Sequence, residues 1–64
     1  MTFSVNLKRL RELSNLTQEE LAAKAGTSKS AISMYERGER VPRDEIKIRL
    51  ARYFGVSVEE LFYA

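Results

Sequence analysis

Two helix starts and one helix stop fall close together between Thr17 and Ser28, and this arrangement limits the folds open to the chain. Thr17 and Glu20 have the spacing of a capping box, which predicts that a helix begins directly after Thr17. Gly26 is placed to take the left-handed conformation that ends this helix, and Ser28 can cap a following helix over residues 29–36. Two short helices with so short a connection must cross steeply.

A steep crossing needs a small side chain where the helices touch, a residue that tolerates positive φ at the corner, and apolar side chains on the inner faces. Ala22 and Gly26 meet the first two needs. The apolar residues expected to meet the third need are Leu21, Ala25, Ile32 and Tyr35. The pattern therefore predicts two packed helices within residues 18–37, and a plain helical hairpin in a small bundle is the alternative.

Five short amphipathic helices fit the whole sequence, and no stretch alternates in polarity over the length of a strand. The expected helices cover residues 4–14, 18–25, 29–36 and 44–54, with a last helix after Ser57. Ser57 and Glu60 form a second capping box there. A chain of 64 residues is at most one domain, over residues 1–64, so we predict a single all-α domain.

The spacing of apolar residues predicts which helix faces are buried. In the first helix these residues are Leu7, Leu10 and either Leu13 or Ser14, and in the fourth they are Ile46, Leu50 and Phe54. Phe3 is expected to fold back onto the core, whereas Lys47, which lies between two isoleucines, could shift the fourth stripe by one residue. The pair Phe62 and Tyr63 either completes the core or lies at a seam between two copies.

The composition excludes several classes of function. Without cysteine and histidine, the chain can form neither a disulfide nor a cysteine/histidine zinc site. No apolar run approaches the roughly 18 residues of a membrane span, and the N-terminal sequence lacks a signal peptide's apolar region, so we expect a soluble, unexported protein. Adjacent carboxylates such as Glu19 and Glu20 do not face each other on a helix. We therefore expect no enzyme activity, cofactor, metal or small-molecule ligand.

Basic residues gather in the middle of the chain. Residues 29–52 hold seven lysines and arginines against four acidic residues, although the whole chain has a net charge of only +2. A positive stripe favours an anionic polymer such as nucleic acid, and a solvated basic face is the alternative.

The predicted helix over residues 29–36 has a polar outer face. If Ile32 and Tyr35 face the core, the side chains that point outward are Lys29, Ser30, Ser33, Met34 and Arg37. Short side chains at its start would let this helix enter a DNA major groove, which is about 12 Å wide. There Lys29 could donate to guanine, the Ser30 hydroxyl could donate or accept, and Met34 could touch a thymine methyl group.

The segment LTQEELAAKAGTSKSAISMYERGERVPR resembles the Cro/C1-type helix-turn-helix family, which comprises phage repressors and xenobiotic-response-element-like transcriptional regulators. The segment YFGVSVEELF is similar to that family's usual ending, so the resemblance covers residues 7–62. It implies a compact five-helix, lambda-repressor-like DNA-binding domain with its helix-turn-helix at residues 18–37. It also implies a cytoplasmic, prokaryotic or phage-encoded protein that binds double-stranded operator DNA, generally with two copies on one site.

The resemblance assigns roles by position in the motif. The residues at base-reading positions are Lys29, Ser30 and Met34, with Ser33 on the same face. The residues at phosphate-contacting positions are Gln18, Thr17, Ser28, Arg37, Arg40 and Arg43. In the family, the glutamine matched by Gln18 also braces the recognition helix. Arg11 and Glu36 match a pair that in some members joins the first and third helices by an ion pair.

Sequence-specific DNA binding as a transcriptional regulator, most simply a repressor, is the predicted function. A single helix-turn-helix covers few base pairs, so we expect a homodimer on a pseudopalindromic operator with half-sites about 10 base pairs apart, or a multiple of that. The pairing surface would lie on the fourth and fifth helices, unless the chain is the DNA-binding piece of a longer protein. The alternative is an antitoxin-like module that binds a partner protein through residues 61–63, with or without binding to its own promoter.

Overall fold

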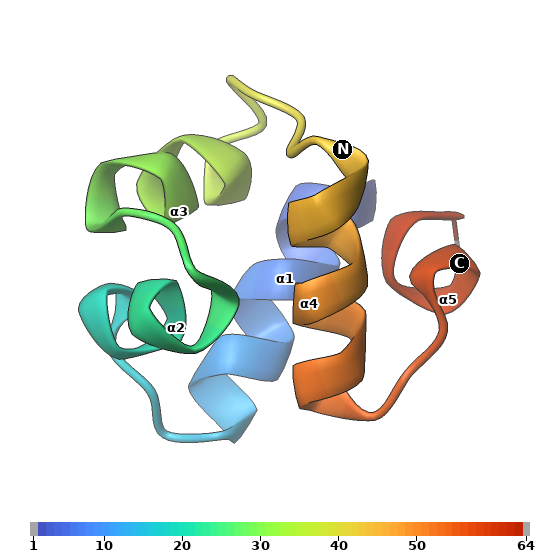
Figure 1. Cartoon of the computed structure of the whole chain (residues 1–64), viewed down its shortest axis with the longest axis horizontal. Helices are drawn as coiled ribbons and strands as arrows, with labels where there is room; N and C mark the ends of the chain where they lie inside the picture. The colour runs from blue at the N-terminus through green and yellow to red at the C-terminus, as the bar shows by residue number, and fades with distance from the viewer. Residues whose placement is uncertain (1, 64) are drawn as a thin grey trace.

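The computed structural model describes residues 2–63, which form five α-helices and no strand (Figure 1). The helices are α1 (Thr2–Leu13), α2 (Gln18–Ala25), α3 (Lys29–Glu36), α4 (Asp44–Phe54) and α5 (Val58–Tyr63). Figure 1 shows α2 and α3 on one side of the molecule and α5 on the other, with α1 and α4 between them. The predicted all-α, five-helix fold is confirmed. Within residues 2–63, no helix combines the length and the apolar character needed to cross a membrane.

The first helix begins earlier than the sequence predicts. α1 starts at Thr2 rather than Ser4, and it ends at Leu13, one residue before the predicted end. Phe3 lies inside this helix and stacks on Phe62 of α5, with ring centroids 4.0 Å apart and an interplanar angle of 13°. Contact with a residue far away in the sequence therefore stabilises the additional helical residues. No signal in the neighbouring sequence predicts this earlier start of α1.

One predicted core position on α1 is wrong. Leu13 is 74% exposed, whereas Leu7 is fully buried and Leu10 is partly buried. Phe3, Leu7 and Leu10 share one face because successive residues turn by about 100° around a helix. Leu13 lies beyond the edge of that face, and Ser14, which would continue it, follows the end of the helix.

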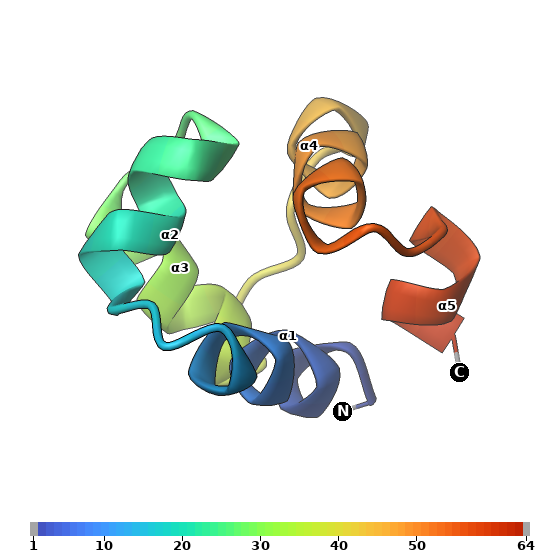
Figure 2. The same ribbon diagram turned by 90° about the horizontal axis from the view of Figure 1, so that it is seen from below.

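Each helix supplies one large, fully buried side chain to a common core. These residues are Leu7, Leu21, Ile32, Leu50 and Leu61. Burial of a side chain of this size stabilises the folded state by about 1.5–3 kcal/mol relative to exposure. Figure 2 shows α1 and α4 between α5 and the pair formed by α2 and α3, so this shared core supports α3 from one side and leaves its other face outward.

The apolar stripe of α4 keeps its predicted register. Its inner face includes Ile46 and Leu50, which are buried, and Phe54, which is partly buried. Ile48 is 44% exposed, so Lys47 does not shift the stripe. The Lys47 ammonium nitrogen lies 4.9 Å from the centroid of the Phe62 ring, within the range of a cation–π interaction. The lysine therefore covers the edge of the core without a charge inside it.

The two aromatic residues at the end of α5, Phe62 and Tyr63, differ in burial. Phe62 is only 8% exposed and completes the core against Phe3, whereas Tyr63 is 74% exposed. Leu61 is also buried. Of the apolar segment over residues 61–63 that an antitoxin-like module would use, only Tyr63 is therefore open to a partner, and that alternative loses most of its proposed surface.

Candidate nucleic-acid interface

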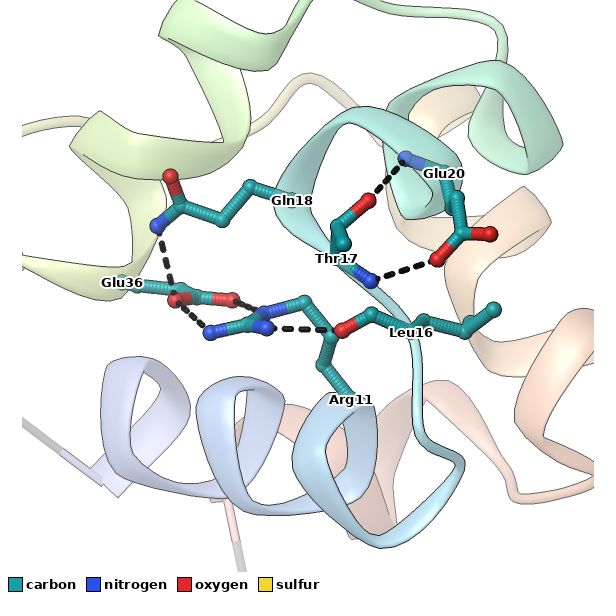
Figure 3. Close-up of polar contacts among 6 residues, drawn as sticks. All are labelled: Arg11, Leu16, Thr17, Gln18, Glu20 and Glu36. Atoms are coloured by element: carbon teal, nitrogen blue, oxygen red, sulfur yellow. Dashed lines mark hydrogen bonds and ion pairs between the residues drawn. The ribbon is translucent and has the colours of Figure 1, made fainter.

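Local hydrogen bonds and one glycine position α2 and α3. Thr17 Oγ1 accepts from the backbone N–H of Glu20 over 3.1 Å, and the Thr17 N–H donates to the Glu20 carboxylate over 2.8 Å (Figure 3). Gly26 turns the chain with a φ of 71°, where a side chain would be strained. Ser28 Oγ then accepts from the Ala31 N–H over 3.1 Å and begins α3. The predicted bounds of both helices are confirmed.

The buried face of α3 determines what the opposite face presents. Ile32 and Tyr35 are buried in the core, and Ala22 is buried on α2, so the outer face of α3 is free of core contacts. A shallow hollow on the surface is lined by Gln18, Lys29, Ser30, Ser33, Met34 and Arg37. The structure therefore brings the four predicted base-reading residues together, beside two of the residues predicted to contact phosphates.

The Glu36 carboxylate joins three helices (Figure 3). Its side chain is 4% exposed and accepts from Arg11, with Nε to Oε2 at 2.6 Å and Nη2 to Oε1 at 3.1 Å. The side-chain nitrogen of Gln18 donates to the same Oε1 over 3.1 Å. Arg11 Nη1 also donates to the Leu16 carbonyl over 2.8 Å. The hydrogen bond and charge of Glu36 raise the pKa of Arg11, so the guanidinium stays charged within this network.

Hydrogen bonds inside the protein leave donors for a ligand at three of the predicted phosphate contacts. The Gln18 amide gives one N–H to Glu36, so its second N–H and its carbonyl oxygen remain. The hydroxyl oxygens of Thr17 and Ser28 accept as helix caps, and each hydroxyl keeps its own proton to donate. These residues can therefore bind a phosphate oxygen without breaking the bonds that define α2 and α3.

The two arginines of the loop between α3 and α4, Arg40 and Arg43, do not line the hollow on the outer face of α3. Arg40 and Arg43 are exposed in the connection between α3 and α4. They line a second hollow together with Gly26 and Thr27 of the turn that precedes α3. Pro42 is buried between them and anchors the loop. The loop therefore presents its positive charge beside the turn, not on the outer face of α3.

Two contacts of Arg37 at the end of α3 were not predicted from the sequence. Arg37 Nη1 donates to Ser33 Oγ over 2.5 Å, and Arg37 Nη2 donates to the Glu39 carboxylate over 3.0 Å. The available signal is Gly38, because a glycine directly after the C-cap residue, here Arg37, reverses the chain and returns the next residue to the helix end.

Two short helices joined by a tight turn, with polar and basic side chains on the outer face of the second, define a helix-turn-helix DNA-binding domain. The sequence profile of a helix-turn-helix family matches residues 7–61 of this chain. The chain belongs to this Cro/C1-type helix-turn-helix family of DNA-binding transcriptional regulators.

Three curated relatives illustrate the range of the family. The chain is 43% identical over 56 residues to an uncharacterized HTH-type transcriptional regulator from Methanocaldococcus jannaschii, which covers 88% of this chain and 85% of the relative. It is 39% identical over 61 residues to the transcriptional activator BcrR of Enterococcus faecalis, with 95% of this chain and 30% of BcrR covered. It is 37% identical over 59 residues to the cryptic phage CTXphi transcriptional repressor RstR of Vibrio cholerae, with 92% of this chain and 53% of RstR covered. The chain thus spans about half of RstR and less of BcrR, and no solved structure matches it at a comparable level.

Proposed function

We propose that this protein is a repressor that binds double-stranded operator DNA through the outer face of α3. The observation that supports this function best is the hollow where Lys29, Ser30, Ser33 and Met34 lie together. A helix in the major groove meets base pairs that each present a distinct pattern of donors, acceptors and methyl groups. Lys29 would donate to guanine O6 or N7, the two serine hydroxyls would donate or accept, and Met34 would contact a thymine methyl group.

Contacts to phosphates would hold α3 in register on the duplex. The residues proposed for these contacts are Gln18, Thr17, Ser28, Arg40 and Arg43. Figure 1 shows the start of α2 and the loop between α3 and α4 on different sides of α3. A duplex that receives α3 in its groove would therefore meet phosphate donors along both edges of that groove.

The size of the domain supports binding by two copies. Its dimensions are 24 × 23 × 21 Å, which correspond to about seven base pairs at a rise of about 3.4 Å. One copy would therefore cover one half-site, and a homodimer would cover a pseudopalindromic operator. Ile48 on α4 and Tyr63 on α5 are exposed apolar residues on the helices expected to form the pairing surface.

Repression is the simplest regulatory outcome for such a domain. Occupation of an operator is sufficient to block transcription, whereas activation needs a further productive contact. The protein would act in the cytoplasm of a prokaryotic cell, where operator DNA is accessible.

Selection of bound duplexes from a random pool tests the proposal. The enriched sequences should share a two-fold related motif with half-sites about 10 base pairs apart, or a multiple of that. The logarithm of the affinity should fall linearly with the logarithm of salt concentration, by about 0.9 for each phosphate contact. A pool without any enriched sequence would contradict DNA recognition. A reporter promoter that carries the selected site should lose expression when the protein is present, and a gain would contradict the repressor role alone.

A further inference from the structure

The end of α3 is built so that Glu39 returns to the helix it follows. Gly38 has a φ of 72°, in the left-handed region that favours glycine. The Gly38 N–H donates to the Tyr35 carbonyl over 3.1 Å, and the Glu39 N–H donates to the Met34 carbonyl over 2.9 Å. This pair of bonds is a Schellman motif, which reverses the chain and sets Glu39 beside the last turn of α3.

Arg37 is held from two directions by this arrangement. Its Nη1 donates to Ser33 Oγ over 2.5 Å, and its Nη2 donates to the Glu39 carboxylate over 3.0 Å. Ser33 lies one turn before Arg37, so the guanidinium is drawn back along α3 instead of extending from the helix end. Arg37 also lines the hollow on the outer face of α3, beside Lys29 and Met34. The Arg37 hydrogen bond and charge lower the pKa of Glu39, so the pair is fully charged at neutral pH.

We propose that Arg37 reads a guanine through a bidentate contact with O6 and N7, and that Glu39 is a positioning residue that holds the guanidinium for this contact. The inference rests on the proposed function, and it moves Arg37 from the predicted phosphate contacts to the base-reading face. The guanidinium has five N–H donors, and Ser33 and Glu39 occupy two of them. The remaining donors are sufficient for the two hydrogen bonds of an arginine–guanine pair, the commonest specific contact in the major groove.

The ion pair between Arg37 and Glu39 affects discrimination between DNA sequences more than the total affinity for DNA. A phosphate accepts a cation from many directions, whereas a guanine edge requires the guanidinium fork in one plane. A side chain as exposed as Arg37 would otherwise sample many rotamers and lose that freedom on binding. The Glu39 carboxylate also offsets one positive charge, which weakens binding to phosphates of any sequence. Both effects raise the ratio of specific to non-specific affinity.

Charge-matched variants test the role of Glu39. Glu39→Gln and Glu59→Gln each remove one negative charge, and Glu59 lies on α5, on the side of the molecule away from α3 (Figure 1). The dissociation constants of both variants and of the unmodified protein are measured on the selected duplex and on a random duplex. We expect Glu39→Gln to lower the ratio of the two affinities by about tenfold, and Glu59→Gln to leave that ratio unchanged. Equal ratios in all three proteins would overturn the inference.

Guanine analogues test the contact made by Arg37. Each guanine of the selected duplex is replaced in turn by 7-deazaguanine, which lacks the N7 acceptor. One position should weaken binding of the unmodified protein by about tenfold and have no effect on Arg37→Ala, whose side chain has no donor. If every position affects Arg37→Ala as it affects the unmodified protein, Arg37 does not read a guanine. Failure to select any sequence would instead remove the proposed function, and this inference with it.

Discussion

The side-chain nitrogen of Gln18 donates to Oε1 of Glu36 over 3.1 Å, across the contact between the start of α2 and the end of α3. The same carboxylate is held by Arg11 from α1. Gln18 is thus oriented by a residue that the core helices keep in place, while it lines the hollow on the outer face of α3. A residue at the edge of the proposed DNA interface is therefore connected directly to the most buried ion pair of the described structure.

Replacement of Gln18 by alanine should weaken DNA binding without unfolding the domain. The variant loses a proposed phosphate donor, but Glu36 keeps its two bonds from Arg11. We expect a loss of about 1 kcal/mol in binding free energy on specific and random duplexes alike, and a change in unfolding free energy of less than about 1 kcal/mol. Duplex titration and thermal melting measure the two effects. A large drop in melting temperature with unchanged affinity would show that Gln18 is only structural.

Replacement of Glu36 by alanine should destabilise the protein severely. Arg11 would remain as a mostly buried charge without its partner, which costs about 3–5 kcal/mol. Urea unfolding measures this change. Glu45→Ala is the matched control, because Glu45 forms an exposed ion pair with Arg49 at 3.5 Å and should cost less than about 1 kcal/mol. Similar losses of unfolding free energy in the two variants would show that burial does not make the Arg11–Glu36 ion pair more important for stability than an exposed pair.

The residues proposed to read bases and those proposed to bind phosphates should differ in their effect on specificity. Lys29→Ala and Met34→Ala should each cost about 1–3 kcal/mol on the selected duplex and relax the base preference. Arg43→Ala should weaken binding to all sequences by a similar factor. It should also reduce the slope of log affinity against log salt concentration by about one. Titrations on specific and random duplexes at several salt concentrations separate these outcomes. If Lys29→Ala loses both affinities equally, Lys29 contacts phosphate and not bases.

The neighbouring aromatic residues of α5 should behave in opposite ways. Phe62→Ala removes a buried ring stacked on Phe3 and should cost about 3–5 kcal/mol of stability. Tyr63→Ala removes an exposed side chain and should change the stability of the monomer by less than about 0.5 kcal/mol. Sedimentation of Tyr63→Ala with and without the selected duplex then tests whether Tyr63 contributes to pairing. A strongly destabilised Tyr63→Ala would place this ring in the core.

Acid should weaken the cap of α5. The Ser57 N–H, which donates to the Glu60 carboxylate over 2.9 Å, and the Ser57 side chain hold the pKa of Glu60 below its ordinary value of 4.5. The Glu60 N–H donates in turn to Ser57 Oγ over 2.9 Å and completes the capping box. A lowered pKa in the folded state contributes stability that is present above 4.5 and is lost as the pH falls through the lowered value. Urea midpoints should therefore separate the unmodified protein from Glu60→Gln at pH 7, and the difference should shrink towards pH 3. A difference that stays constant with pH would contradict the role of the carboxylate.

Local signals were sufficient for most helix bounds. The capping boxes at Thr17 and Ser57, and the serine cap at Ser28, predicted the starts of three helices correctly. These signals act between residues three positions apart, so the sequence contains them directly. The start of α1 was predicted wrongly because it depends on the contact of Phe3 with Phe62. The third core position of this helix was predicted as either Leu13 or Ser14, and both are exposed.

The sequence by itself determined most helix bounds and the residues that face outward from α3, because these follow from caps and from the periodicity of apolar residues. The class of the protein came from the resemblance of residues 7–62 to a known family. The resemblance also led us to expect the Arg11–Glu36 ion pair, which the structure contains. Only the tertiary structure decided the side-chain partners of Gln18 and Arg37. Gln18 meets Glu36 across 18 positions, and Arg37 meets Glu39 only because the chain reverses at Gly38. Hydrogen bonds depend on distance and angle between atoms brought together by packing, and side-chain periodicity alone contains no information about those contacts.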